Sequence, residues 1–280
     1  MNKSIDDVKE FWEENPLFSG ESSFTPGSRE FFEDHRRVYI DDVFAKHFDE
    51  ALYIPKLEAN AKVLDLGCGI GFWTVEMLKR GKYENMHSAD LTESALKNLS
   101  KRLEYNNLNS ELSIQNAEDM TFEDAYFDHI NCQGVIHHTP NTQKTVAEMN
   151  RVLKNGGTAY ISVYYKNLFL RNWRSIKFIA KLLSALGAKL SGRGRESIFD
   201  LNDIDEITRL YDGDKNPIGK SYSKKEAIKL VEEYFEVEKV FLNYFPARSL
   251  PFKIPNFFHR FLSKHFGFMI HLNLKKKERA

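Results

Sequence analysis

Cysteine is scarce in this sequence, because only Cys68 and Cys132 occur among its 280 residues. Two cysteines cannot build a disulfide scaffold, and their scarcity fits a reducing compartment. Long apolar runs are also missing, since no stretch approaches the roughly 18 residues that a membrane-spanning helix needs. The first residues lack the apolar centre of a secretion signal. We therefore expect a cytoplasmic protein that is stabilised by its core.

A net charge is absent as well, since 40 Lys and Arg residues balance 40 Asp and Glu residues. A globally basic nucleic-acid binder is therefore disfavoured, and we expect no nucleic-acid partner. The nine histidines do not cluster at ligand spacings, so the sequence predicts no metal site. What the chain does have is a hydrophobic fraction of 42%, with 13% aromatic residues, which is enough for a sizeable core.

Charge is nevertheless distributed unevenly along the chain. Residues 1–50 hold 13 acidic and 6 basic side chains, and residues 166–195 hold eight basic side chains and no acidic one. In this second segment, apolar residues recur at three- and four-residue spacing, which is typical of an amphipathic helix. Such a charge run is either a solvated helix face or a contact with an anionic partner, such as a phosphate-bearing substrate or a membrane surface. Weak peripheral membrane contact through residues 166–195 is thus one expectation.

Strand and helix patterns alternate through the middle of the chain. Short apolar or alternating runs predict seven strands, and capped periodic segments between them predict helices. A doubly wound α/β fold with a mostly parallel sheet follows, and its last strand is compatible with an antiparallel edge. The expected strands cover residues 62–66, 87–90, 111–115, 126–132, 158–164, 235–242 and 268–274.

Four segments follow from this pattern. Residues 1–60 look helical and aromatic and are expected to form a lid, and residues 61–165 form the ligand-binding core. Residues 166–222 are expected to form a helical cap inserted after the fifth strand. Residues 223–280 complete the sheet.

A glycine-rich turn follows the first expected strand. Gly67 and Gly69 let the backbone approach a ligand closely, and Gly71 lets the next helix begin near the strand. A nicotinamide-binding fingerprint would place its last glycine at position 72, where this chain has Phe72. An oxidoreductase that uses nicotinamide therefore remains only an alternative. Asp90 ends the second strand, where an acid can accept hydrogen bonds from a ribose diol.

Residues 62–71 resemble the first motif of the class I S-adenosylmethionine-dependent methyltransferases, and Asp90 resembles the acid after their second strand. Three later segments resemble further motifs of this family, in the family's order: residues 116–120, residues 127–140 and the Arg-Val-Leu-Lys-Asn-Gly-Gly turn at 151–157. Together they cover about residues 60–165. The resemblance is greatest to the small-molecule branch, which includes the ubiquinone and menaquinone methyltransferases (methyltransferase type 11), and it implies a Rossmann-like fold. Asn155 and Thr121 stand where the family often has proline.

The resemblance implies that S-adenosyl-L-methionine is the cofactor. Asp65 and the backbone of Gly67, Cys68 and Gly69 would hold its methionine moiety. Asp90 would accept hydrogen bonds from both ribose hydroxyls.

The remaining motifs imply contacts at the other end of the cofactor. Leu91 would pack on the adenine ring, and Asn116, Ala117 and Glu118 would contact its edge. Gln133 would lie near the sulfonium.

His137 and His138 follow the fourth strand, at the rim where an acceptor should lie. Either is a candidate general base, which a hydroxyl or carbon-acid acceptor would need. Loop packing is the alternative role for both histidines. Tyr164 and Tyr165 end the fifth strand, where they would either touch the acceptor or only pack.

The resulting expectation is an enzyme that transfers a methyl group to an O, C or N atom of a small-molecule or lipid-like acceptor. The basic cap suits an amphiphilic or anionic acceptor. The Asn/Asp-Pro-Pro-Tyr signature of amide and exocyclic-amine methyltransferases is absent, which argues against DNA and protein-glutamine substrates. A non-catalytic protein that binds S-adenosylmethionine remains an alternative.

Overall fold

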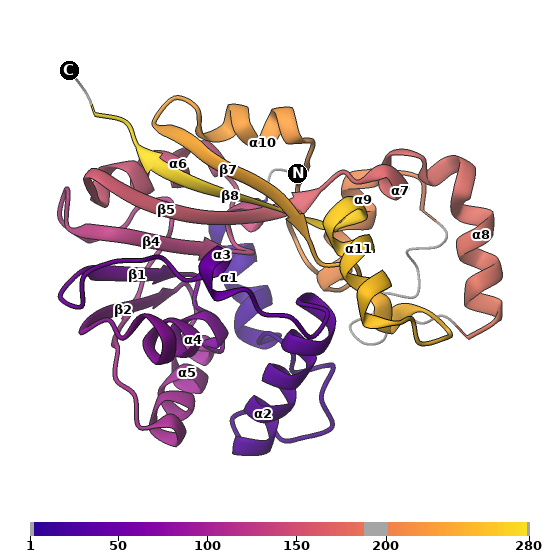
Figure 1. The fold of residues 1–280 in the computed structure, drawn as a ribbon, viewed down its shortest axis with the longest axis horizontal. Helices are drawn as coiled ribbons and strands as arrows, with labels where there is room; N and C mark the ends of the chain where they lie inside the picture. Colours follow the sequence, from indigo (N-terminus) through magenta and orange to yellow (C-terminus); the bar gives the residue numbers. More distant parts are fainter. Residues whose placement is uncertain (1–2, 188–200, 279–280) are drawn as a thin grey trace.

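One mixed β-sheet organises the protein. The computed structural model describes residues 3–187 and 201–278. Neighbouring strands follow the order β3-β2-β1-β4-β5-β8-β7, and a short β6 pairs with β5 outside this path (Figure 1). The strands are β1 (Lys62–Leu66), β2 (Asn85–Asp90), β3 (Glu111–Ile114), β4 (Phe127–Gln133), β5 (Leu153–Tyr165), β6 (Ser221–Tyr222), β7 (Phe235–Asn243) and β8 (Met269–Lys276).

The expected fold class is confirmed, with one more strand than the sequence predicts. β8 runs antiparallel to both β5 and β7, and the other strand pairs are parallel. The additional strand, β6, has only two residues, too few to show a hydrophobic period. The turn expected at residues 154–157 belongs instead to the start of β5, where the pairing with β4 shifts register.

Helices pack on both sides of the sheet because their apolar faces need cover. The helices of the core are α4 (Phe72–Gly81), α5 (Glu93–Asn106), α6 (Thr142–Val152) and α10 (Lys224–Val231). The largest buried cluster joins β1, β4, β5 and β8 to α6 and α10, with Phe127, Ile130, Val163 and Phe235 almost fully buried. This packing fixes the carboxyl ends of the parallel strands at one edge.

The N-terminal segment lies across that edge. It contains α1 (Ile5–Glu14), α2 (Arg29–Val38), a π-helical turn (Tyr39–Val43) and α3 (Glu50–Tyr53). Ser4 and Asp7 form a capping box at the N-terminus of α1. The Glu13 carboxylate accepts hydrogen bonds from the backbone N–H groups of Glu93 and Ser94, each at 2.9 Å. These N–H groups begin α5, so a negative side chain of α1 satisfies the positive end of a core helix.

A second group of helices lies at one end of the molecule, at the right of Figure 1. It consists of α7 (Leu168–Arg171), α8 (Trp173–Ala185), α9 (Ile204–Arg209) and α11 (Asn256–Phe266). α11, which no pattern in the sequence predicts, lies between β7 and β8 and joins these two antiparallel strands. The end of the expected basic segment, residues 188–195, lies outside the described residues. Within the described part of the chain, no helix is both long and apolar enough to cross a membrane.

Candidate functional site

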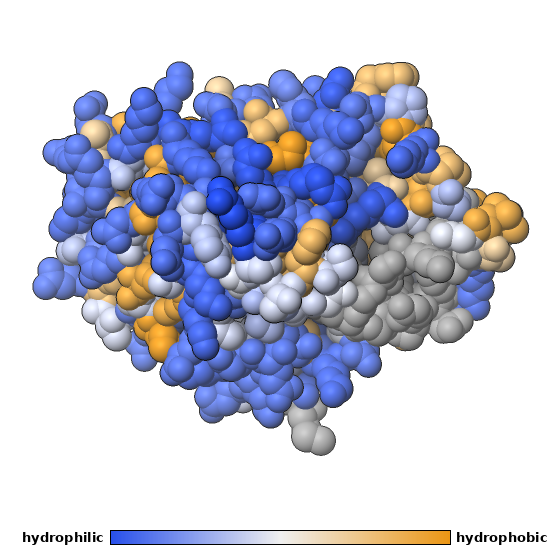
Figure 2. All heavy atoms as spheres, turned by 90° about the horizontal axis from the view of Figure 1, so that it is seen from below, coloured by the Kyte–Doolittle hydropathy of each residue, from blue (hydrophilic) through white to orange (hydrophobic). Residues whose placement is uncertain are grey.

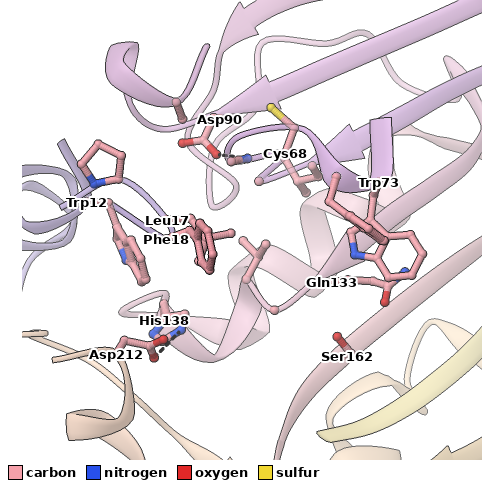
Figure 3. Close-up of a pocket in the computed structure, with 18 of the residues that line it drawn as sticks. Trp12, Leu17, Phe18, Cys68, Trp73, Asp90, Gln133, His138, Ser162 and Asp212 are labelled. Atoms are coloured by element: carbon pink, nitrogen blue, oxygen red, sulfur yellow. Dashed lines mark hydrogen bonds and ion pairs between the residues drawn. The ribbon is translucent and has the colours of Figure 1, made fainter. Parts of the chain in front are cut away.

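A cavity of about 290 Å³ opens at the carboxyl ends of the parallel strands. Its walls come from the N-terminal segment, the ends of β1, β2, β4 and β5, and the segments around residues 212 and 248. This is where ligands bind in open α/β sheets. Figure 3 shows Asp90, Cys68 and Gln133 on the core side of the cavity, and Trp12, Leu17 and Phe18 on the side of the N-terminal segment.

The glycine-rich turn forms the floor of the cavity. Gly67 has a φ of +71°, and a Cβ atom there would lie 2.3 Å from a Cγ atom of Val135. The N–H groups of Gly67 and Cys68 both donate to the carbonyl of Ala89, which fixes the turn against the end of β2. A side chain at position 67 would both strain the backbone and displace Val135. The turn therefore brings backbone to the cavity with no side chain in the way.

Asp90 faces the cavity from the end of β2. Its Oδ2 accepts a hydrogen bond from the Gly69 N–H at 2.9 Å, and its Oδ1 accepts from the N–H and hydroxyl of Thr92 at 3.1 and 2.9 Å. Burial raises the pKa of Asp90, and the three donors oppose that shift. One carboxylate thus organises the glycine turn and the start of α5 together.

The structure brings eight of the ten expected cofactor-binding residues to this cavity: Gly67, Cys68, Gly69, Asp90, Leu91, Asn116, Ala117 and Gln133. Glu118 is not among the lining residues. Its Oε1 instead accepts from the backbone N–H of Asn141 at 2.6 Å, at the start of α6. The expected contact of Glu118 with the adenine edge therefore stays a prediction, which its absence from the lining residues does not support.

Asp65 does not line the cavity either. It is 1% exposed, and its two oxygens accept hydrogen bonds from the Thr74 hydroxyl at 2.6 Å and from the Asn131 amide at 2.7 Å. Burial raises the pKa of Asp65 to about 6. The Asn131 side chain accepts in turn from the Gln133 amide at 2.8 Å. Asp65 therefore positions the cavity residue Gln133 through Asn131. The expectation that Asp65 itself contacts a ligand does not agree with its burial.

The two histidines after β4 have different surroundings. His138 lines the cavity, and its Nδ1 donates to the Ile218 carbonyl at 2.6 Å, because a carbonyl can only accept. This assigns the proton to Nδ1 in the neutral ring and leaves a lone pair on Nε2. The Nε2 atom lies 3.5 Å from Oδ2 of Asp212, and the same Oδ2 accepts from the Tyr164 hydroxyl at 2.5 Å (Figure 3).

His137 is fully buried and outside the cavity. Its ring lies 4.1 Å from that of Tyr164 and 4.2 Å from that of His138, measured between centroids. Burial holds the pKa of His137 well below its usual value. His137 is therefore a neutral packing residue, and its position does not fit the role of a general base.

Several cavity residues were not expected from the sequence. Asp212 comes from a short turn of 3₁₀ helix, and Trp12 packs edge-on against the His138 ring at 5.3 Å. Arg248 also lines the cavity, where it pairs with Asp42 at 3.3 Å and with Glu21. No local pattern marks these residues, because each comes from a different part of the chain.

The charges that line the cavity are mostly negative. Among the described lining residues, carboxylates come from Glu21, Asp42, Asp90 and Asp212, and Arg248 is the only lysine or arginine. Such an arrangement attracts a cationic ligand. The sulfonium of S-adenosylmethionine is a cation of the kind that these carboxylates would attract.

Comparison with known proteins agrees with this geometry. A sequence profile of the family described as "Methyltransferase domain" matches residues 63–157. A demethylmenaquinone methyltransferase of Staphylococcus carnosus is 28% identical over 206 residues, which cover 69% of this chain and 80% of that protein. A ubiquinone biosynthesis O-methyltransferase of Azoarcus is 30% identical over 132 residues, 47% of this chain and 52% of that protein. An S-adenosylmethionine-dependent methyltransferase from Methanosarcina mazei has a similar structure, with a TM-score of 0.55, 18% identity, and 82% and 97% of the two chains covered.

Proposed function

This chain is a class I S-adenosylmethionine-dependent methyltransferase of the small-molecule type, and we propose that its acceptor group is an ionisable hydroxyl on a mostly apolar ring. The observation that carries this proposal is the position of His138, which lines the cavity, donates from Nδ1 to the Ile218 carbonyl and has its Nε2 3.5 Å from Oδ2 of Asp212. This assignment replaces the nicotinamide oxidoreductase alternative. We do not adopt the other alternative, a protein that binds S-adenosylmethionine without catalysing a reaction.

His138 is the proposed general base. Its Nε2 takes the proton of the acceptor hydroxyl, and the resulting imidazolium is stabilised by the carboxylate of Asp212 at 3.5 Å. The Tyr164 hydroxyl fixes that carboxylate through its hydrogen bond of 2.5 Å. A positioned base of this kind contributes about 10²–10⁴-fold to a rate. Deprotonation matters because an oxyanion is a far better nucleophile than a neutral hydroxyl.

The cofactor-binding residues have proposed roles of their own. When bound, the cofactor supplies a methyl group already activated by a positive sulfur. Asp90 accepts hydrogen bonds from the ribose hydroxyls, and Leu91 packs against the adenine. Asn116 and Ala117 lie at its edge, and Gln133 faces the sulfonium. Holding both reactants in one orientation supplies much of the acceleration, on the order of 7–11 kcal/mol in favourable cases.

The remaining walls support an aromatic acceptor. Beyond His138, the cavity is lined by Trp12, Tyr39, Val43, Tyr211, Tyr244 and Met269. Flat rings pack well against such walls. The excess of carboxylates argues against the anionic acceptor that the basic cap had suggested, since like charges repel in a buried site. Relatives named for menaquinone and ubiquinone methylation support a quinol-like ring.

The test is an acceptor screen with a labelled methyl donor. The purified full chain is incubated with phenols, naphthols and quinols, and with their methyl ethers and amine analogues, and the products are identified by mass. The expected product is a methyl ether formed only from free hydroxyls. Methylation of amines alone, or of ring carbons alone, contradicts the proposed acceptor group.

The role of the base is tested separately with His138→Gln. We expect a turnover about 10²–10⁴-fold lower, with unchanged affinity for S-adenosylmethionine. The wild-type rate should rise with pH and level off, whereas the variant should follow only the ionisation of the acceptor. The matched control is His47→Gln, which changes an exposed histidine of the N-terminal segment. A loss of less than tenfold refutes the assignment of His138.

A further inference from the structure

Large apolar side chains are exposed mainly in two segments of the chain. Among the described residues, thirteen large hydrophobic side chains are exposed, and ten of them belong to residues 168–186 and 252–261. Phe257 is 70% exposed, Leu186 67% and Phe178 66%. Contiguous apolar surface of this kind marks an interaction site more often than chance exposure does. The ten residues are Leu168, Phe169, Phe178, Ile179, Leu182, Leu186, Phe252, Phe257, Phe258 and Phe261.

The two segments meet at one end of the molecule. The ring of Phe169 in α7 lies 5.4 Å from that of Phe266 at the end of α11 and 6.3 Å from that of Phe245. Figure 1 places α8 and α11 at the same end, and Figure 2 shows hydrophobic residues gathered there in another view. We call the exposed residues of 168–186 and 252–261 the α8/α11 surface.

The charge of both segments has one sign. Residues 166–187 and 245–277 contain no Asp or Glu. Exposed or partly exposed basic side chains accompany the apolar ones on α7, α8, α11 and the segment just before α11: Arg171, Arg174, Lys177, Lys181, Lys253, Arg260 and Lys264. The rest of the chain compensates, since the whole protein has no net charge. The basic residues are therefore concentrated where the apolar residues are exposed.

We propose that the α8/α11 surface docks on a lipid bilayer that contains anionic lipids. Aromatic and aliphatic side chains enter the boundary between headgroups and acyl chains, while lysine and arginine pair with lipid phosphates. A second copy of the chain fits poorly, because a symmetric interface would bring the same basic residues face to face. A protein partner fits less well, because interface cores are depleted in lysine.

The α8/α11 surface adjoins one wall of the cavity. Tyr164 and Tyr244 line the cavity and share a buried cluster with Leu170 of α7. Arg248, which also lines the cavity, precedes Phe252 by four residues. A bilayer under the α8/α11 surface would thus lie near the wall of the cavity that Tyr164 and Tyr244 form, where an apolar acceptor is proposed to bind. The docking proposal goes beyond the proposed reaction and does not depend on it.

Vesicle co-sedimentation tests the proposal with the full chain. The vesicles contain phosphatidylcholine alone, or phosphatidylcholine with about one third phosphatidylglycerol, at low and high salt. We expect binding only to the anionic vesicles, and a large loss at about 0.5 M salt, where screening is strong. Arg174→Gln with Arg260→Gln and Lys264→Gln should weaken binding by about tenfold to a hundredfold, since each charge near the surface contributes about fivefold.

A second variant tests the apolar part, and a control tests specificity. Phe257→Ser with Phe261→Ser should weaken binding about tenfold without loss of fold, because both rings are half exposed or more. The control Lys97→Gln with Lys101→Gln and Lys225→Gln removes three exposed charges from α5 and α10. This control should bind as the wild type does.

Three results overturn the proposal. One is the absence of binding to anionic vesicles at low salt, and another is equal loss in the charge variant and in its control. The third is a concentration-dependent dimer, measured by light scattering, that Phe257→Ser with Phe261→Ser abolishes. Affinity for S-adenosylmethionine, measured by calorimetry on the same proteins, separates a failure of docking from a failure of the methyltransferase site.

Discussion

Asp90 offers the sharpest test of the cofactor site, because one carboxylate serves both the protein and the proposed ribose contact. Replacing it with alanine leaves the N–H groups of Gly69 and Thr92 without their acceptor. Each buried group left unpaired costs about 1–3 kcal/mol. Losing a charged acceptor for the ribose costs a further 1.5–3 kcal/mol or so in binding, about tenfold to a hundredfold in affinity.

The isosteric change Asp90→Asn separates these two effects. Asparagine keeps one accepting oxygen, so it can serve either Gly69 or Thr92 but turns an amide N–H toward the other. We expect Asp90→Asn to lose affinity for S-adenosylmethionine with a smaller loss of stability than Asp90→Ala. Calorimetric titration measures the affinity, and thermal unfolding measures the stability.

The pH dependence of cofactor affinity and of stability gives an independent test of the role of Asp90. Because burial raises the pKa of Asp90, the carboxylate becomes neutral at a higher pH than an exposed aspartate does. Cofactor affinity should therefore fall as the pH drops through that pKa. The contribution of Asp90 to the free energy of unfolding should rise over the same window, because the folded state binds the proton more tightly.

The control for these measurements is Asp128→Asn. Asp128 accepts from the Lys62 N–H and from the Lys154 ammonium and does not line the cavity. We expect it to change stability and to leave cofactor affinity unchanged. Unchanged affinity in both Asp90 variants, with the fold intact, would refute the assignment of Asp90 to the ribose.

Three further outcomes follow from the site. Gly67→Ala should abolish measurable cofactor binding by calorimetry, because a Cβ atom would lie 2.3 Å from Val135 and the φ is +71°. Burial raises the pKa of Asp65 to about 6, so its contribution to stability should fall by up to about 3 kcal/mol as the pH rises from about 4 to about 6. Denaturant unfolding across this range should show a slope that Asp65→Asn lacks. Tyr164→Phe removes the donor to Asp212, and steady-state kinetics should show kcat about tenfold lower with cofactor affinity retained.

The core of the fold was predictable because its signals are local. The apolar run of β1 ends in a glycine turn, and both lie together in the sequence. The direction of the Asp65 side chain was not predictable, because it depends on Asn131, which lies 66 residues later. Asp212 reaches His138 only because residues 220–222 return to β5, where the Lys220 N–H donates to the His137 carbonyl.

Helix α11 was not predictable from the sequence for a related reason. Hydrophobic periodicity identifies a helix through the contrast between a buried apolar face and an exposed polar face. In α11 the buried positions are His259 and Ser263, while Phe257, Phe258 and Phe261 are exposed. The usual contrast is inverted, so the pattern gave no signal.

The contact of Glu13 with the first N–H groups of α5 links the N-terminal segment to the loop that carries Asp90. If this segment also had an open arrangement, its closed arrangement and a bound cofactor would stabilise one another, and by reciprocity each would shift the equilibrium of the other equally. The apparent dissociation constant equals the intrinsic one divided by the closed fraction. A substitution in α1 that reduces this fraction to about one tenth would weaken cofactor binding about tenfold without touching the cofactor. The N-terminal fifty residues would thus set the cofactor concentration at which the enzyme becomes half saturated.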